Sequence, residues 1–179
     1  MTDQQIHGAG PGSTARRGTG YDVAFAGARI AVGSYWLYEQ HWKLPPGFGL
    51  HDARGLMFAF EQSIQYPTVG FVRTLLQNVV VPHFHLFGWL LLLVEVTIGM
   101  SLVLGAWTRA GALFGVLQAV NLLLAQGRTP EGPWIYLAIL AANLFVLFTP
   151  SNRRFSVDAW RGRQRSGVRS PATDTERGA

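Results

Sequence analysis

One carboxylate, Glu95, stands near the middle of a long apolar stretch and is the first candidate for chemistry in this sequence. It is the only charged side chain between Phe84 and Leu104. Placing an ionised carboxylate at the centre of a bilayer costs about 3 kcal/mol, so such a residue normally faces other helices and has a polar partner. Arg29, in an earlier apolar stretch, is the most obvious partner in the sequence.

Helix geometry allows Arg29 and Glu95 to meet. Arg29 lies about seven residues from the inner end of its predicted span and Glu95 about nine from the inner end of the next, a depth difference of about 3 Å. Three interpretations stay open. The pair could only fix the helix register, since buried ion pairs rarely add net stability. It could anchor a quinone or similar ligand and handle protons beside it. Alternatively, Arg29 could extend to the inner head groups.

Four histidines gather at the predicted outer edge of the membrane, close to Glu39: His51 and the three ligand candidates His41, His83 and His85. None lies in the predicted membrane interior, which disfavours haem held by two histidines of this chain. They could be interfacial structural residues. Alternatively, one of them could bind a quinol head group and exchange protons with it, because histidine titrates near neutral pH.

Gln118 and Asn121 are the polar residues of a later apolar stretch. Such side chains either join helices by hydrogen bonds in lipid or line a pocket for a polar head group. The chain has no cysteine, which excludes disulfides, thiolate zinc sites and iron–sulfur ligation. We therefore expect no intrinsic haem, iron–sulfur cluster or zinc, and we expect any electron transfer to use a bound quinone or a partner subunit.

The elements that must position these side chains are four apolar helices. About 20 apolar residues match the thickness of a bilayer, and the predicted spans are residues 22–42, 84–104, 110–125 and 134–148. The predicted fold is therefore an all-α, four-helix transmembrane bundle. Residues 52–80 show two amphipathic patterns separated by Pro67, which predict short interfacial helices. These helices would be either a scaffold or a lid over a ligand site.

Composition and charge divide the chain into a membrane domain, residues 21–150, a flexible N-terminal tail, 1–20, and a basic C-terminal tail, 151–179. The net charge is +5, but the arginines flank the predicted spans, which favours a lipid bilayer over nucleic acid as the partner. More arginines lie on the side of the two termini. This bias predicts a multi-pass protein of the cytoplasmic (inner) membrane with both ends in the cytoplasm.

A family resemblance rests mainly on the end of the Glu95 stretch and the turn after it. The chain resembles the DoxX family, which includes the DoxD-type small subunit of thiosulfate:quinone oxidoreductase, over roughly residues 22–150. The residues that carry this resemblance are Ala28-Arg29-Ile30, Gly33, Lys43-Leu44, Glu95, Gly99, Leu102, Leu104-Gly105-Ala106, Thr108-Arg109 and Gly111-Ala112. The resemblance implies a prokaryotic four-helix membrane protein, often a subunit of a redox complex that passes electrons to quinone.

Three functions follow from these observations. The first is a quinone-binding membrane subunit of an oxidoreductase or respiratory-type complex. The second is a non-catalytic anchor or assembly subunit that packs against other subunits. The third is a small proton-coupled transporter, because four-helix exporters also use one intramembrane glutamate. The charge asymmetry and the long outer segment argue against the transporter.

Overall fold

The structure is a computed structural model that describes residues 12–130 and 132–149. Every regular element in this part of the chain is helical, which confirms the predicted all-α class. The elements are α1 (Gly12–Tyr38), α2 (Leu56–Gln65), α3 (Gly70–Leu75), the π-helix η1 (Leu76–Val80), α4 (Phe84–Leu104), α5 (Thr108–Gln126) and α6 (Trp134–Phe148).

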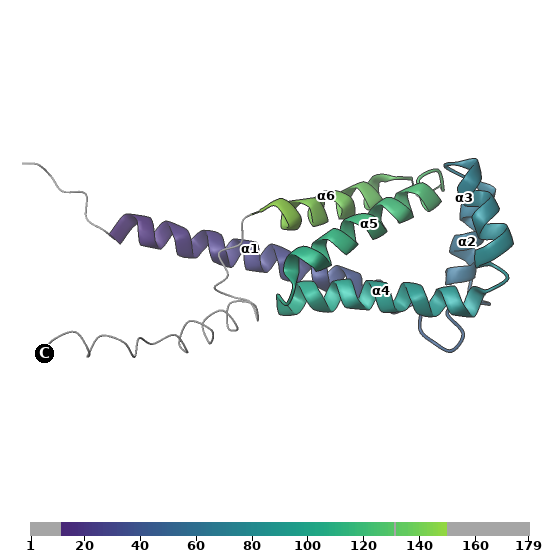
Figure 1. Cartoon of the computed structure of the whole chain (residues 1–179), viewed down its shortest axis with the longest axis horizontal. Helices are drawn as coiled ribbons and strands as arrows, with labels where there is room; N and C mark the ends of the chain where they lie inside the picture. Colours follow the sequence, from purple (N-terminus) through teal and green to yellow (C-terminus); the bar gives the residue numbers. More distant parts are fainter. Residues whose placement is uncertain (1–11, 131, 150–179) are drawn as a thin grey trace, which may run out of the picture.

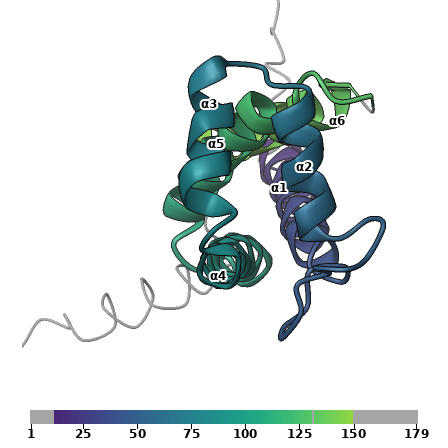
Figure 2. The same cartoon turned by 90° about the vertical axis from the view of Figure 1, so that its right-hand side faces the viewer.

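The four longer helices run lengthwise, and the shorter ones lie across one end of them (Figure 1). Helix α1 packs against α4, and α5 packs against both α4 and α6. Figure 2 shows α2 and α3 in front of this bundle, at the end where α4 begins and α5 ends. Helix α1 extends beyond the other helices at the opposite end (Figure 1).

The contact between α1 and α4 is set by two glycines. A Cβ atom on Gly33 would lie 2.8 Å from both the carbonyl oxygen of Gly99 and the amide nitrogen of Val103. A Cβ on Gly99 would lie 2.7 Å from Cγ of Leu37. Only residues without a side chain permit such a close approach. This contact fixes which residues of the antiparallel helices α1 and α4 face each other.

The small residues of α5 pack within this chain. A Cβ on Gly111 would clash with Ser101 of α4, and a Cβ on Gly115 would clash with Asn143 of α6. Ala119, the next residue of this stripe, is completely buried. The face of α5 that carries these small residues is therefore occupied by α4 and α6.

Helix α1 differs from the predicted span at both ends. It begins at Gly12, well before Asp22, and ends at Tyr38 rather than at Trp42. Its early start has a simple cause, because extending a formed helix by one residue adds one hydrogen bond, whereas nucleation is costly. Of the predicted tails, residues 1–11 and 150–179 lie outside the described part of the chain.

The two predicted amphipathic helices are present and flank Pro67, as α2 before it and α3 with η1 after it. Leu56 and Phe60 of α2 are buried, whereas Glu61 and Gln65 are exposed. Leu56 and Phe60 belong to a second apolar core that contains residues of η1 and the start of α4. This core attaches the short helices to the end of the bundle.

Two of the described helices, α4 and α5, are long and apolar enough to cross a membrane, with mean hydropathies of 2.1 and 1.4. Only 28% of the most apolar window of each is buried in the protein, whereas a core helix of a soluble protein would be mostly buried. Exposed apolar faces of this kind pack against lipid or against helices of another protein. Helix α6 is apolar but shorter, with 15 residues. The large apolar side chains exposed on α4 and α5 are Leu86, Trp89, Leu90, Leu93, Val94, Met100, Leu104, Leu113, Phe114, Leu117, Val120 and Leu124.

Candidate functional site

Glu95 is only 1% exposed and lies at the centre of a buried polar cluster. Lys43 Nζ forms an ion pair with Glu95 Oε2 at 2.7 Å. Gln40 Nε2 donates a hydrogen bond to the same oxygen at 2.7 Å, and Gln118 Nε2 donates to Oε1 at 3.2 Å. Both carboxylate oxygens therefore have donors, as a buried charge requires.

The predicted pairing of Glu95 with Arg29 is wrong, because the cation at Glu95 is Lys43. The reason is the helix register. Arg29 lies four residues before Gly33, and Glu95 lies four residues before Gly99, but the two helices are antiparallel. The two side chains therefore start on opposite sides of the glycine contact, about 12 Å apart along the bundle. Arg29 itself is buried in α1.

Lys43 reaches Glu95 because the chain turns back after α1. Beyond Tyr38 the backbone forms tight turns, and Gln40 Nε2 donates to the carbonyl oxygen of Trp36 at 3.0 Å, which satisfies one of the free carbonyls at the helix end. The amide of Lys43 donates to the carbonyl oxygen of Gln40 at 3.0 Å. Neither Lys43 nor Gln40 was among the site residues predicted from the sequence. The local sequence shows only that the helix must end, because Pro45 and Pro46 follow Lys43. It does not show where the side chain of Lys43 or Gln40 points.

A second buried hydrogen-bond chain connects α1 with α6 near this cluster. Trp36 Nε1 donates to Asn143 Oδ1 at 3.4 Å, and Asn143 Nδ2 donates to the carbonyl oxygen of Ile139 at 2.8 Å. Trp36 is 1% exposed and Asn143 is completely buried. The polar cluster thus lies where α1, α4, α5 and α6 meet.

A cavity of about 400 Å³ lies between the bundle and the short helices, and it reaches Glu95 and Lys43. Charged side chains in its lining are those two residues and Glu39. The lining is otherwise mostly apolar and comes from α1, α2, α3, η1, α4, α5 and α6. Its apolar and aromatic members are Trp36, Trp42, Leu56, Phe60, Phe71, Val72, Leu75, Leu76, Val80, Phe87, Leu91, Leu122, Leu124, Ala125 and Ile139.

Further polar groups line the cavity away from Glu95. Tyr136 Oη donates to Gln126 Oε1 at 2.6 Å, and Trp42 Nε1 donates to Glu39 Oε2 at 3.3 Å. Asn121 also borders the cavity. The cavity therefore has a charged floor, apolar walls and hydrogen-bonding groups at separate points, an arrangement typical of sites for amphipathic small molecules.

The structure brings two more of the predicted site residues to this region, Gln118 at Glu95 and Asn121 in the cavity lining. The three histidines are exposed and do not line the cavity. His41 Nδ1 lies 2.7 Å from the carbonyl oxygen of Tyr38, and His83 Nδ1 lies 2.9 Å from that of Val79. The ring of His85 lies beside those of Phe48 and Phe84, with centroids 6.3 and 5.5 Å away.

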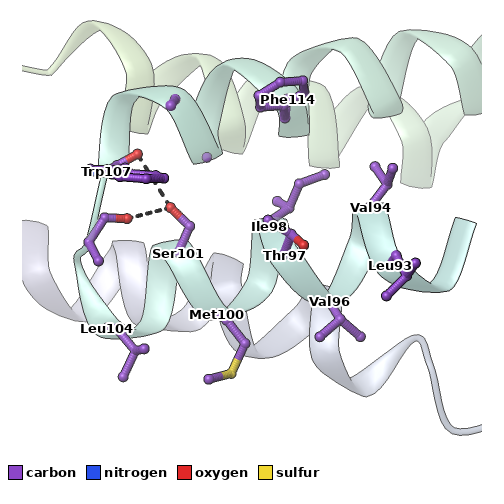
Figure 3. Close-up of a pocket in the computed structure, with 13 residues that line it drawn as sticks. Leu93, Val94, Val96, Thr97, Ile98, Met100, Ser101, Leu104, Trp107 and Phe114 are labelled. Carbon is purple, nitrogen blue, oxygen red and sulfur yellow. Dashed lines mark hydrogen bonds between the residues drawn. The ribbon is translucent and has the colours of Figure 1, made fainter. Parts of the chain in front are cut away.

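A second hollow of about 620 Å³ lies between α4 and α5, near the turn that joins them (Figure 3). Apolar side chains such as Ile98 and Phe114 dominate its lining, which includes no charged residue. Ser101 Oγ donates to the carbonyl oxygens of Ala106 at 2.6 Å and Trp107 at 3.3 Å, which stabilises the turn (Figure 3). This hollow can accept hydrocarbon but offers no group for acid–base chemistry.

Within residues 12–130 and 132–149, no group of three or more His, Asp or Glu side chains is arranged to hold a metal ion. Comparison with protein-family models, with curated proteins and with solved structures finds no match. The candidate site therefore rests on its own geometry.

Proposed function

We propose that this protein is a membrane subunit of a quinone-linked redox complex and that the cavity above Glu95 holds the ring of a quinone. The observation that carries the proposal is the cavity itself, in which a buried ion pair forms the floor of an otherwise largely apolar chamber. A quinone has the matching chemistry, since its ring carries two carbonyl oxygens and its substituents and tail are apolar.

The size and the boundary of the cavity support this proposal. A volume of about 400 Å³ lies within the usual range for small-molecule sites. The walls formed by α2, α3 and η1 place these short helices over the charged floor, which favours the lid interpretation over a simple scaffold. The resemblance of the Glu95–Ala112 stretch to the DoxX family supports the choice of quinone among amphipathic ligands.

We also propose that all four long helices of the bundle span the membrane, with both termini in the cytoplasm. Helices α4 and α5 have the length and composition of spans. Helix α6 lies along α5, and α1 lies along α4, so all four would share the same layer of lipid. The arginine bias between the two sides supports the orientation, and a prokaryotic inner membrane fits the same resemblance.

A non-catalytic anchor is the second candidate function, and the exposed apolar faces of α4 and α5 favour it. Such faces can bind either lipid or the helices of another subunit. The small residues of α5 are not available for a partner, because α4 and α6 already pack against them. An anchor would co-purify with its complex and would still assemble after the cavity is filled.

The test of the quinone site is a cavity-filling variant, Ala125→Phe, because Ala125 lines the cavity. The matched control is Ala141→Phe, at an exposed position of α6 that does not line it. We expect quinone to be extracted with the wild-type protein and the control purified in mild detergent, but not with Ala125→Phe. In lipid nanodiscs, added quinone should cause a saturable quenching of tryptophan fluorescence in the same two proteins, because Trp36 and Trp42 line the cavity. Equal binding by both variants, or no saturable binding by the wild type, would refute the proposal.

Glu95→Gln is not a clean test of this function. The change would leave the ammonium of Lys43 buried without its counter-ion, and an unpaired buried charge is strongly destabilising. A loss of activity in that variant would therefore report folding as well as binding. Filling the cavity leaves the ion pair unchanged.

A further inference from the structure

We infer that Lys43 is the residue that binds the ligand in this cavity, by donating a hydrogen bond to a carbonyl oxygen, and that Glu95 only positions Lys43. This inference rests on the proposed function, since it assigns the polar contact within the same site. It differs from the sequence-based interpretation, in which Arg29 and Glu95 together could anchor the ligand.

The hydrogen bonds of Glu95 are already used within the protein. Its two oxygens accept from Gln40, Lys43 and Gln118, and the carboxylate is 1% exposed. An ionised carboxylate can only accept hydrogen bonds. A carbonyl oxygen of a quinone also only accepts, so the two groups cannot bind each other.

The Lys43 ammonium has N–H donors left for a ligand. An ammonium group carries three N–H donors, and among the described residues Glu95 is the only hydrogen-bond acceptor in contact with Nζ. The side chain is 8% exposed and borders the cavity. Nζ also lies 4.5 Å from the centroid of the Trp42 ring, which further fixes its position. A buried ammonium held at one donor can direct the others to a ligand.

The charges around the cavity select the kind of acceptor. Two carboxylates, Glu39 and Glu95, border it together with one ammonium, Lys43. The excess negative charge disfavours an anionic head group such as a fatty-acid carboxylate or a phosphate. A cationic head group cannot accept a hydrogen bond from the Lys43 ammonium, which also repels it at close range. A neutral carbonyl is left as the polar group that the site accepts.

The experiment compares three ligands and two double variants. The ligands share one isoprenoid tail and differ in the head, which is a quinone, a benzene ring without carbonyls or a carboxylate. Lys43→Met with Glu95→Met removes the ion pair as a whole, a replacement that buried pairs often tolerate. Arg54→Met with Glu61→Met removes the same charges from exposed positions outside the cavity lining.

For the wild type and the control we expect quinone to bind at least about tenfold more tightly than the other two ligands, as is typical of one hydrogen bond from a charged donor. The Lys43→Met, Glu95→Met protein should lose this preference. With quinone labelled with ¹³C at each carbonyl in turn, one carbonyl stretch should shift to lower frequency in the wild type and the control only.

Each opposite outcome identifies what has failed. If wild-type protein binds no quinone, both this inference and the proposed function are refuted. If it binds quinone but shows no preference over the carbonyl-free ligand, or prefers the carboxylate, the quinone site stands and the role of Lys43 is refuted. The comparison of ligands on wild-type protein alone can refute the inference even if the double variant does not fold. A preference for quinone that a folded Lys43→Met, Glu95→Met protein retains would refute it as well.

Discussion

Glu95 and Lys43 form a buried ion pair whose two members depend on each other. Both side chains are more than nine-tenths buried, and the carboxylate receives additional hydrogen bonds from Gln40 and Gln118. The energetic consequence is asymmetric. Removing one member leaves a buried charge without its counter-ion, whereas removing both leaves an apolar contact.

We therefore expect Lys43→Met to lower the free energy of unfolding by about 3–5 kcal/mol, and the double variant Lys43→Met, Glu95→Met to restore most of that loss. Unfolding in mixed micelles, followed by the helical circular dichroism signal, measures both values. Arg128→Met, at an exposed position, serves as the control and should change stability by less than about 0.5 kcal/mol. The single variant Glu95→Met completes the double-mutant cycle, and additive effects of Lys43→Met and Glu95→Met would show that the pair is not coupled.

The candidate site depends on the contact of α1 with α4, because this contact determines which side chains face Glu95. Gly33 and Gly99 let the two backbones touch, and the Glu95 cluster lies just beyond that contact in the direction of Gln40 and Lys43. A wider separation of α1 and α4 would draw the donors away from the carboxylate.

Gly33→Ala tests this contact. Its Cβ would lie 2.8 Å from backbone atoms of Gly99 and Val103, which cannot move as a flexible side chain can. We expect a loss of about 1–3 kcal/mol in stability from overpacking, together with weaker quinone binding in nanodiscs. Gly27→Ala is the matched control on the same helix. No atom lies within 4 Å of its Cβ, so the better helix propensity of alanine should leave stability unchanged or raise it by up to about 1 kcal/mol. Equal effects of the two changes would contradict the assigned role of Gly33.

The two ends of the molecule differ, because only one of them holds the cavity near Glu95. The end closed by α2 and α3 holds the cavity, and the opposite end holds the α4–α5 turn and the N-terminal part of α1 (Figure 1). In the proposed topology the cavity end faces away from the cytoplasm, so the ligand site lies near the outer surface of the membrane. The partner subunits and the electron donor would have to match that side.

The absence of cysteine from the whole sequence makes this orientation simple to measure. His51→Cys places a thiol in an exposed loop at the cavity end, and Arg109→Cys places one at the exposed start of α5. In intact cells a membrane-impermeant maleimide should label the first variant but not the second, and permeabilised cells should show both labelled. The cysteine-free parent is the blank. Labelling of Arg109→Cys alone in intact cells would invert the proposed topology.

The sequence by itself determined most of the helices, though not the ends of α1, and the burial of Glu95. Helix α4 runs over Phe84–Leu104 and α6 over Trp134–Phe148, as predicted, because apolar composition and helix-breaking residues act locally. The amphipathic pattern around Pro67 likewise gave the short helices. Glu95 had to be buried among helices, since a single carboxylate in such an apolar stretch has no other low-energy position.

Only the tertiary structure decided which cation pairs with Glu95 and where a ligand fits. The choice of Lys43 over Arg29 depends on the α1–α4 register and on the direction of the turn after Tyr38. The cavity requires seven helical segments to enclose one space. Both outcomes follow from contacts between residues far apart in the chain, and a shift of a few residues in one helix would change them while leaving every local pattern the same.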